Sequence, residues 1–239
     1  MAFIHGSTTK ILGDEWDLSP YFNQANLNKQ AQAVDATNFG SSGNRQYVYG
    51  LESGSAAFAG LFDGAVSIAA DANLTTALGA EGIYTVCLNG YDTIGKPAVL
   101  FKGENVSYQV RSPVQDIVRT QFNATVDGGI RFGGVVLHTL TAETTTGNYT
   151  SVDNTALTSV GGVGHLHVTS FTGTNVTVKI QHSTDNSVWA DLITFTSVTG
   201  VTSERSTVTG TVNRYVRAQI SAGTFTSVTF AVAFARNKQ

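Results

Sequence analysis

Apolar and polar residues alternate along much of this 239-residue chain, most regularly in its second half. Three runs there have apolar residues two positions apart: Val176, Val178 and Ile180; Val216, Ala218 and Ile220; and Val228, Phe230, Val232 and Phe234. Successive side chains of a β-strand point to opposite faces, so each run predicts a strand with one apolar face. Turn-forming residues 183–187, just before Trp189, separate the first two runs. Strands and turns at this spacing predict an all-β sandwich.

The first half of the chain is less regular, with strand-like runs on either side of one helical stretch. The runs are residues 8–12, 31–36, 55–62, 82–88, 98–102, 107–111, 115–125 and 132–137. Residues 71–79 begin with Asp71 as a capping residue, place Leu74 and Leu78 four apart and end at Gly79, which predicts a helix. One helix among strands predicts a β-sandwich or half-barrel with the helix against one face.

The change of pattern near residue 138 predicts two domains in a mainly β protein. Residues 139–164 are rich in Thr and Gly and nearly free of charge, which is typical of a linker that becomes a first strand. We therefore expect one domain at residues 1–138. The second, at residues 139–239, is expected to be an Ig-like or jelly-roll-like β-sandwich.

Charge is scarce in this sequence. Charged residues make up 13% of the chain, about half the usual share, and the net charge is −3. No run is rich in Lys or Arg, which disfavours tight binding to a nucleic-acid backbone. A surface with so few charges associates easily, which indicates that neighbours cover much of it. The N-terminus lacks the pattern of a signal peptide and no apolar stretch reaches membrane length, so we expect synthesis in the cytoplasm without ordinary secretion.

A glycine-rich segment before Arg45 invites comparison with a phosphate-binding loop. It consists of Gly40, Ser41, Ser42, Gly43 and Asn44. Glycine lets backbone N–H groups approach an anion, but the segment lacks the Lys-Ser/Thr ending of a P-loop and no predicted helix follows it. The sequence therefore favours an exposed, mobile loop.

Two histidines are the best metal candidates in the sequence. His165 and His167 lie two apart on a predicted strand, so they share one face. The sequence does not fix the facing of His182, and no other third ligand is evident. Half-exposed surface histidines are therefore the favoured interpretation, and we expect no metal and no cofactor.

Catalytic signals are weak. Asp14, Glu15 and Asp17 form an acidic cluster, but glycosidic hydrolysis depends on a carboxylate separation that sequence cannot give. The chain has no nucleophile elbow and no zinc-protease motif. Cys87 lies in a strand-like run, which predicts a buried, inert thiol. We expect a protein that is not an enzyme.

One combination of residues is more specific. In chain order it comprises Asp35 and Thr37; a loop with Arg45 and Tyr47; Gly50, Leu51 and Gly54; and Gly60, Phe62 and Asp63. This order resembles the pattern of phage tail tube proteins, the major tail proteins of phages with long, non-contractile (siphovirus-type) tails. In that family a strand leads into a long loop, and a Gly-Leu-x-x-Gly turn returns the chain into the next strand. The helix at residues 71–78 fits the same fold, so the resemblance implies a tail-tube-like first domain.

The second half carries a resemblance of its own. Residues 165–169, 181–189, 213–217 and 230–236 are similar to the C-terminal β-domain that actinobacteriophage-type major tail proteins carry outside the tube. The two resemblances together cover most of the chain.

The resemblance implies a structural virion protein of the phage tail. Such proteins form homohexameric rings that stack into a tube, and the tube conducts double-stranded DNA during genome ejection. The implied partners are other copies of the chain, a tape measure protein, and tail terminator and distal tail proteins, with no membrane. A net-negative chain without basic runs suits a lumen that repels phosphates.

A flexible loop can become ordered on contact with the next ring. We therefore predict that a loop at residues 39–50 makes contacts between rings or subunits. The residues assigned to this contact are Phe39, Gly40, Ser41, Ser42, Gly43, Asn44, Arg45, Tyr47 and Tyr49. Asp35 and Asp63 contribute either to ring contacts or to the lumen, and the sequence does not decide between them.

Other functions remain open at this point. A carbohydrate-binding module is an alternative for the second half, because Trp189, Tyr215 and Phe225 could stack on sugars, although their positions in strands favour core packing. A capsid decoration or head–tail joining protein is a second alternative. A glycan hydrolase that uses the acidic cluster is the least favoured.

Overall fold

The computed structural model describes residues 4–63 and 70–238, and nearly all of its regular structure is β. The elements are η1 (Gly6–Thr8), β1 (Lys10–Gly13), β2 (Trp16–Asp17), β3 (Phe22–Asp35), β4 (Tyr47–Leu61), α1 (Ala70–Thr76), β5 (Glu81–Cys87), β6 (Pro97–Arg111), β7 (Arg119–Glu143), β8 (Gly147–Asn148), β9 (Val152–Asp153), β10 (Gly162–Ser183), β11 (Ala190–Thr194), β12 (Thr202–Val208) and β13 (Tyr215–Arg236). The prediction of a mainly β fold is confirmed.

The N-terminal half is an antiparallel sheet in the order β3–β4–β7–β6–β5–β1–β2. Aromatic rings hold its apolar face together. Phe58 of β4 lies directly opposite Phe122 of β7, with ring centroids 6.4 Å apart, and 6.5 Å from Phe101 of β6. Stacked rings add to the free energy that burial of their area already contributes. The register of β4 on β7 thus also fixes the centre of this core.

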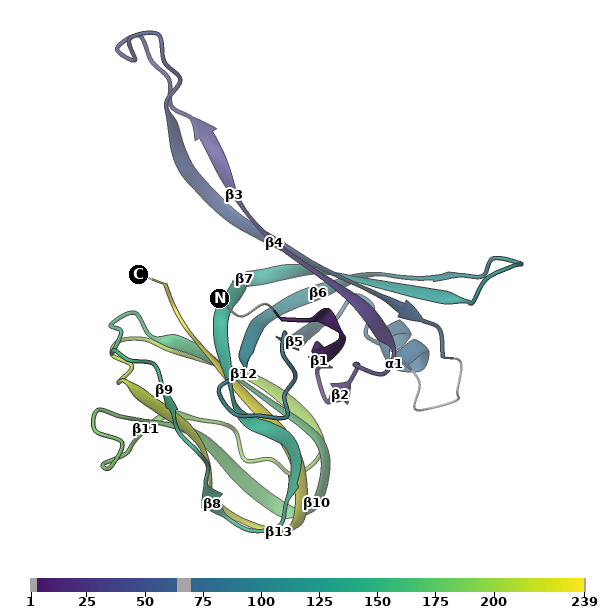
Figure 1. Cartoon of the computed structure of the whole chain (residues 1–239), viewed down its shortest axis with the longest axis vertical. Helices are drawn as coiled ribbons and strands as arrows, with labels where there is room; N and C mark the ends of the chain where they lie inside the picture. Colours follow the sequence, from purple (N-terminus) through teal and green to yellow (C-terminus); the bar gives the residue numbers. More distant parts are fainter. Residues whose placement is uncertain (1–3, 64–69, 239) are drawn as a thin grey trace.

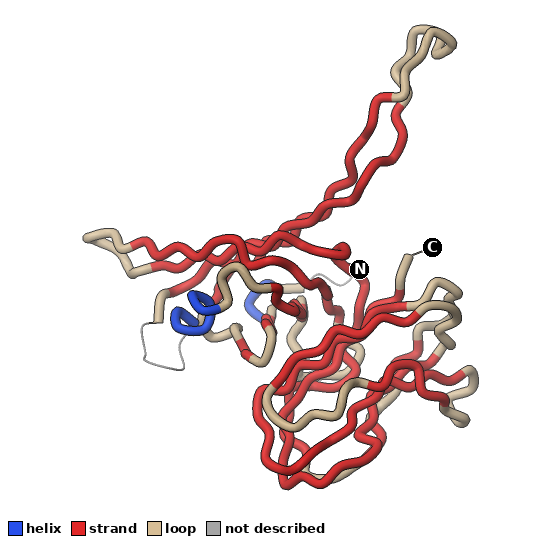
Figure 2. Tube along the Cα trace, turned by 180° about the vertical axis from the view of Figure 1, so that it is seen from behind, coloured by secondary structure: helices blue, strands red, loops and turns tan. Residues whose placement is uncertain are grey.

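Helix α1 covers this aromatic core and is shorter than the sequence predicted (Figure 2). Leu74 is buried in the core, as its position predicted. The helix ends at Thr76, so Leu78 lies in the following turn and is 40% exposed. Gly79 has a φ of +78°, which agrees with its predicted place at the end of the helix, because this backbone conformation favours glycine.

Two hairpins extend from the body of the molecule (Figure 1). The β3–β4 hairpin pairs with β7 only over Ser55–Leu61, so residues 29–54 form a two-stranded ribbon, here called the long arm. The outer part of the β6–β7 hairpin, residues 105–125, is here called the short arm, and β4 lies along one side of it.

Two predicted strand pairs are each one continuous strand. Residues 98–102 and 107–111 both belong to β6, and residues 119–125 and 132–137 both belong to β7. Gly128, Gly129 and Gly133 have positive φ within β7, so this strand bends without ending. The sequence pattern left residues 126–131 outside both predicted runs, whereas pairing on both sides of them maintains the strand.

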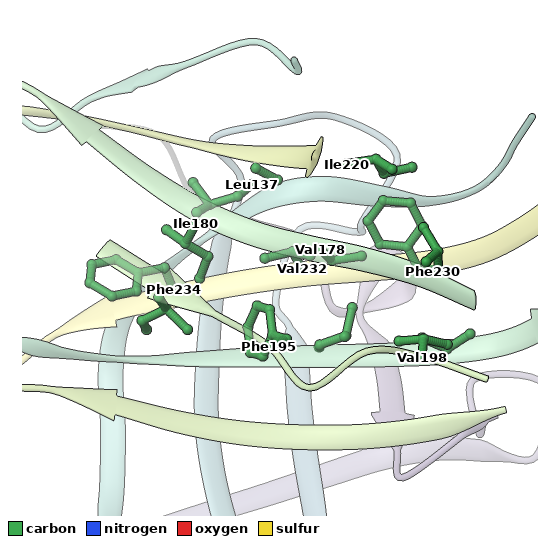
Figure 3. Packing of buried hydrophobic residues seen from close by; sticks show 14 of the residues in the cluster. Leu137, Val178, Ile180, Phe195, Val198, Ile220, Phe230, Val232 and Phe234 are labelled. Carbon is green, nitrogen blue, oxygen red and sulfur yellow. The ribbon is translucent and has the colours of Figure 1, made fainter. Parts of the chain in front are cut away.

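A long ribbon of β10 and β13 builds the C-terminal half. Its pairing runs from Gly162 opposite Arg236 to Ser183 opposite Tyr215, and β-bulges interrupt it at several places. The bent ribbon encloses a large apolar cluster with Phe195 of the loop after β11 and Val198 (Figure 3). The runs that begin at Val176, Val216 and Val228 are buried as their alternation predicted.

The end of β13 is buried on both faces, which alternation did not predict. Ala231, Ala233 and Ala235 lie on the face opposite Phe230, Val232 and Phe234, and they are also buried. Ala233 and Ala235 form a small cluster with Cys87, Ala98, Leu100 and Val136 of the N-terminal half. Small side chains at these positions let the two halves approach closely.

Strand β7 belongs to both halves. Its first part pairs with β4 and β6, and its second part, residues 135–143, pairs with β13. The linker predicted from residue 139 is therefore wrong for residues 139–143, because β13 supplies a pairing partner that the local sequence does not reveal. The division into domains 1–138 and 139–239 stays a prediction, and its boundary falls inside this strand.

No helix in residues 4–63 or 70–238 is both long enough and apolar enough to cross a membrane.

Candidate assembly surfaces

The long arm carries large apolar side chains that face solvent. Phe39 is fully exposed, Leu51 is 83% exposed and Tyr49 is 68% exposed, and Val34, Tyr47 and Val48 are also exposed. A two-stranded hairpin has no sheet neighbour to cover such side chains, and in isolation it is marginally stable in water. An apolar surface of this kind on a protruding ribbon indicates a contact with another chain.

The loop at the tip of the long arm is exposed but locally ordered by hydrogen bonds. The carboxylate of Asp35 accepts from the backbone N–H of Thr37 at 2.8 Å, and the side-chain oxygen of Asn38 accepts from the N–H of Gly40 at 2.8 Å. The hydroxyl of Ser41 accepts from the N–H of Asn38 at 3.0 Å, and Ser41 is buried inside the loop. The loop thus has a defined local shape.

The sequence predicted the exposure of the tip residues. The loop exposes Gly40, Ser42, Gly43, Asn44 and Arg45. The backbone of Ser42 takes the left-handed conformation, with a φ of +49°. No helix begins at this loop, since strand β4 follows it, so the geometry gives an anion no helix N-terminus.

The predicted Gly-Leu-x-x-Gly turn is wrong as a turn. All three residues lie within β4: Gly54 pairs with Lys29 of β3, whereas Gly50 and Leu51 lie at a β-bulge between the pairs Ala33–Tyr49 and Ala31–Glu52. Glycine serves close packing here: a Cβ on Gly50 would come within 2.9 Å of the carbonyl oxygen of Gln32. The return of the chain occurs earlier, in the loop between Asp35 and Tyr47.

The other residues of this motif lie at the base of the arm. Gly60 is near the end of β4, where a Cβ would come within 1.9 Å of the carbonyl oxygen of Tyr21. The backbone N–H of Phe62 donates to the carbonyl of Val118, and Asp63 follows as an exposed residue. These residues fix where the long arm leaves the body, and they do not meet the residues of the tip.

The tip of the short arm is a second exposed apolar surface. Val114 is fully exposed, Ile117 is 61% exposed and Val110 is 47% exposed. Sequence reasoning missed this surface because it interpreted residues 115–118 as the start of a strand. Pro113, which follows Ser112 after an alternating run, is the signal that could have indicated the turn.

The sheet that carries both arms has two open edges. Within the described residues, β3 pairs only with β4, and residues 107–111 of β6 pair only with β7, because β5 ends opposite Glu104 and the backbone of Asn105 bonds to Gly79 and Ala80. An open strand edge presents unpaired N–H and C=O groups that can pair with another chain. The two edges lie on opposite sides of the β3–β4–β7–β6 sheet and differ in sequence, so one copy can pair its β3 edge with the β6 edge of the next.

The two faces of this sheet differ in chemistry. One face carries the aromatic core, with Phe58 and Phe122. On the other face the register aligns amide side chains across neighbouring strands: Gln24 and Asn26 of β3, Gln121 and Asn123 of β7, and Gln109 of β6. Asn123 donates from its amide to the hydroxyl of Ser107 at 2.7 Å. This amide face is polar and carries no carboxylate at these positions.

The histidines predicted to be half-exposed are buried, so that interpretation is wrong. His165 and His167 are 0% and 1% exposed, because β10 lies against β5 and the β1–β2 turn of the N-terminal half. The hydroxyl of Thr85 lies 3.1 Å from Nδ1 of His165 and 2.8 Å from Nε2 of His167. Burial lowers the pKa of His167 to about 4, so this imidazole is neutral near pH 7.

The described residues contain no group of three or more His, Cys, Asp or Glu that could hold a metal ion. His182 accepts a hydrogen bond at Nδ1 from the backbone N–H of Asn213 at 3.2 Å, away from the other two histidines. Cys87 is buried in β5, as predicted, and burial raises the pKa of its thiol to about 12. Its thiolate is therefore not formed near pH 7.

The acidic cluster holds the backbone of the β1–β2 region. The carboxylate of Asp14 accepts from the N–H of Ile83 at 2.8 Å, and that of Asp17 accepts from the N–H of Ser19 at 3.0 Å and from the hydroxyl of Tyr91 at 2.5 Å. Burial raises the pKa of Asp14. The carboxylates of Asp14 and Asp17 thus bind different segments, Asp14 the backbone of β5 and Asp17 the residues Ser19 and Tyr91.

Three aromatic residues of the C-terminal half are half-buried rather than fully buried in its core: Trp189, Tyr215 and Phe225. The guanidinium of Arg217 lies 4.0 Å from the ring centroid of Trp189, and that of Arg214 lies 4.9 Å from that of Tyr215. Phe225 packs against the C-terminal core. Since Arg217 covers one face of Trp189 and also donates to Gln181 at 2.8 Å, this face is not open for a sugar.

No known protein family and no curated protein sequence matches this chain. Among solved structures, a chain of the virion of a native gene transfer agent particle is 17% identical, with a TM-score of 0.42, over 54% of this chain and 97% of that one. The SPP1 tail tube protein is 14% identical, with a TM-score of 0.43, over 54% of this chain and 79% of that one. The SPP1 Dit protein is 14% identical, with a TM-score of 0.34, over 96% of this chain and 99% of that one. Identities and TM-scores of this size assign no function to the chain.

Proposed function

We propose that the protein is a structural component of a phage tail that assembles with copies of itself into hexameric rings, which stack into a tube that conducts DNA. One observation carries the proposal: a sheet with two different open edges bears two protruding hairpins whose exposed side chains are large and apolar. The resemblance of the sequence to tail tube proteins agrees with this arrangement. The distant likeness to solved tail structures is not needed for the argument.

The open edges support a ring. Pairing between the β3 edge of one copy and the edge of β6 at residues 107–111 of the next is a head-to-tail contact, and head-to-tail contacts close into rings when the rotation allows it. Each added copy removes one pair of open edges, and a closed ring has none. Ring closure therefore protects the sheet from uncontrolled edge pairing.

The amide face supports a lumen. In a closed ring of these sheets, one face points inward, and the aromatic face is already covered by the core of each copy. The inward face is then the one with Gln24, Asn26, Gln121 and Asn123. Neutral amides have no charge with which to hold phosphates, and the two arginines on the same face, Arg111 and Arg119, lie at the end of the short arm, where Asp116 pairs with Arg119.

The long arm supports stacking. Its ribbon extends well beyond the sheet, and its tip presents Phe39 in an ordered loop (Figure 1). Contact with a neighbouring copy covers the apolar side chains of the arm, and burial of apolar area is the main favourable free-energy contribution to association. We assign residues 39–50 to contacts between rings or subunits. The proposed location is the virion tail.

Electron microscopy of the purified full-length protein tests this function. Stacked rings or tubes are the expected result. Monomers or trimers that coat capsid shells would instead support a capsid decoration protein, and single rings that do not stack would support a head–tail joining protein. Glycan-array binding that Trp189→Ala abolishes would support a carbohydrate-binding role for the C-terminal half.

A further inference from the structure

A groove of about 570 Å³ lies where the N-terminal sheet meets the C-terminal half. Residues of β5, β6, β7 and β12 line it. Most of these residues are charged: Glu81, Lys102, Asp127, Arg131 and Arg205. Such a concentration of charge is unusual in a chain in which only 13% of residues are charged.

Lysine side chains form ion pairs with the carboxylates of this region. The Nζ atom of Lys102 lies 2.8 Å from Oε2 of Glu81 and 2.8 Å from Oδ2 of Asp127. On the other side of Arg131, Nζ of Lys29 lies 2.8 Å from Oε2 of Glu52. Each nearby carboxylate is thus already paired with an ammonium group.

The two arginines have no such partner. Across residues 4–63 and 70–238, neither Arg131 nor Arg205 forms an ion pair. Nε of Arg131, and Nε and Nη1 of Arg205, are shielded from solvent and make no hydrogen bond there. A guanidinium whose N–H groups are shielded from water without a partner is destabilising.

Neighbouring groups do not compensate the unpaired charges of Arg131 and Arg205. Burial and the charge of Arg131 both lower the pKa of Arg205, while the carboxylates of Asp127 and Glu81 act more weakly in the opposite direction. His165 lies opposite Arg205 in the pairing of β10 with β12, and burial keeps its imidazole neutral. The region contains four cationic side chains, those of Lys29, Lys102, Arg131 and Arg205. It contains three carboxylates, those of Glu52, Glu81 and Asp127, so one positive charge is in excess.

We propose that Arg131 and Arg205 form a binding site for a small oxyanion of the phosphate class, which bridges β7 and β12. The anion accepts hydrogen bonds from the guanidinium N–H groups of the two arginines, whose side chains line the groove. A planar guanidinium matches the oxygens of phosphate with two parallel hydrogen bonds. Because β7 runs through both halves and β12 belongs to the C-terminal half, the bound anion ties the two halves together. This inference does not depend on the proposed assembly.

Thermal unfolding of the full-length protein tests the site. Phosphate, sulfate and acetate are each titrated against chloride at constant ionic strength, and isothermal calorimetry measures phosphate binding directly. A ligand that binds only the folded state raises the melting temperature, by roughly 3–6 °C at ten times its dissociation constant for a chain of this size. We expect a saturable rise with phosphate and sulfate and a smaller one with acetate.

Two variants and a matched control complete the test. Arg131→Gln and Arg205→Gln are expected to lose the phosphate effect, whereas Arg111→Gln, which removes an exposed arginine outside the groove, is expected to keep it. In phosphate-free buffer, Arg205→Gln is expected to melt at the same temperature as the unsubstituted protein or higher, since it removes an unpaired charge. The site is refuted if no saturable rise occurs, if the rise follows ionic strength alone, or if both groove variants respond like the control.

Discussion

Thr85 of β5 and His167 of β10 lie 2.8 Å apart, side chain to side chain, and join the two halves of the molecule at a point from which solvent is excluded. The other ring nitrogen of His167, Nδ1, lies 2.7 Å from the carbonyl oxygen of Asp14. A carbonyl oxygen only accepts, so Nδ1 of His167 carries the proton.

This assignment fixes the rest of the chain of hydrogen bonds. Nε2 of His167 is the acceptor of the hydroxyl of Thr85, and the oxygen of Thr85 in turn accepts from Nδ1 of His165 at 3.1 Å. Every donor in this series points toward Asp14, and the imidazole of His167 must be neutral because its Nε2 accepts. A proton added to His167 would place two donors face to face at Thr85.

The first prediction is that acid destabilises the fold through His167. Its pKa is about 4 in the folded chain and about 6.5 when unfolded, so between these values the unfolded chain binds a proton that the folded chain does not. Stability is therefore full above pH 6.5 and falls as the pH falls toward 4, by on the order of 3 kcal/mol. Urea unfolding at a series of pH values measures this.

The variant His167→Gln isolates that contribution, because every other titrating group remains. The raised pKa of Asp14 acts in the opposite direction, and it remains in both proteins. The difference in unfolding free energy between the two proteins is expected to narrow from pH 7 to pH 4. A difference independent of pH would contradict the neutral assignment.

The second prediction concerns the hydroxyl of Thr85. Thr85→Val keeps the shape of the side chain but leaves Nε2 of His167 and Nδ1 of His165 without a partner inside the interface. A buried polar group without a partner costs about 1–3 kcal/mol, so the free energy of unfolding is expected to fall by at least that amount. Thr85→Ser retains the hydroxyl and serves as the matched control, with a loss that urea unfolding should find to be clearly smaller.

The third prediction concerns Gly60 at the base of the long arm. A Cβ there would come within 1.9 Å of the carbonyl oxygen of Tyr21, a backbone atom that cannot rotate away. Gly60→Ala is expected to destabilise the fold by about 1–3 kcal/mol through overpacking. Gly147→Ala, where no atom lies within 4 Å of the added carbon, should leave the melting temperature nearly unchanged. Equal melting temperatures for the two variants would refute the role given to Gly60.

The fourth prediction separates assembly from folding. Leu51→Asp places a charge on the long arm, where the side chain is 83% exposed, so the fold should change in stability by no more than about 0.5 kcal/mol. Assembly into rings or tubes is expected to be lost, because a desolvated charge opposes the contact. Val188→Asp, at a residue that is 75% exposed in the C-terminal half, is the control and should still assemble in electron micrographs.

The fifth prediction concerns the tip loop. Deletion of residues 41–44 removes the buried hydroxyl of Ser41 that orders the loop, while the ladder of β3 and β4 remains. Tubes are expected to be absent, with circular dichroism and melting temperature close to those of the intact chain. If tubes formed unchanged, residues 39–50 would not be a contact between rings.

The local alternation of apolar and polar residues predicted much of this fold. The predictions failed where burial depends on contacts between residues far apart in sequence. Val176, Val178 and Ile180 are buried as their spacing required, because only one face of that strand meets a core. His165 and His167 looked half-exposed, since a polar residue on a strand usually faces water. Their burial depends on Thr85 and Asp14, which lie more than 80 and 150 positions away in sequence. No local signal carries that information.

For the candidate surfaces too, the sequence predicted some features and missed others. Sequence composition indicated a surface covered by neighbours, and the glycine-rich segment with Arg45 pointed to an exposed loop. Gly50, Leu51 and Gly54 were interpreted as a turn because the resemblance to tail tube proteins implies one, whereas here glycine lets β3 and β4 approach. The short arm was missed because alternation around Val110 continues into residues that belong to a loop.

The unbroken course of β7 determines how the molecule transmits force. A pull on the C-terminal half is carried along a single strand into the N-terminal sheet, where hydrogen bonds to β4 and β6 on both sides are loaded in shear and resist together. A flexible tether would let the C-terminal half swing freely, whereas this connection makes it a stiff lever on the sheet. Any force on the C-terminal half would therefore reach the N-terminal sheet directly.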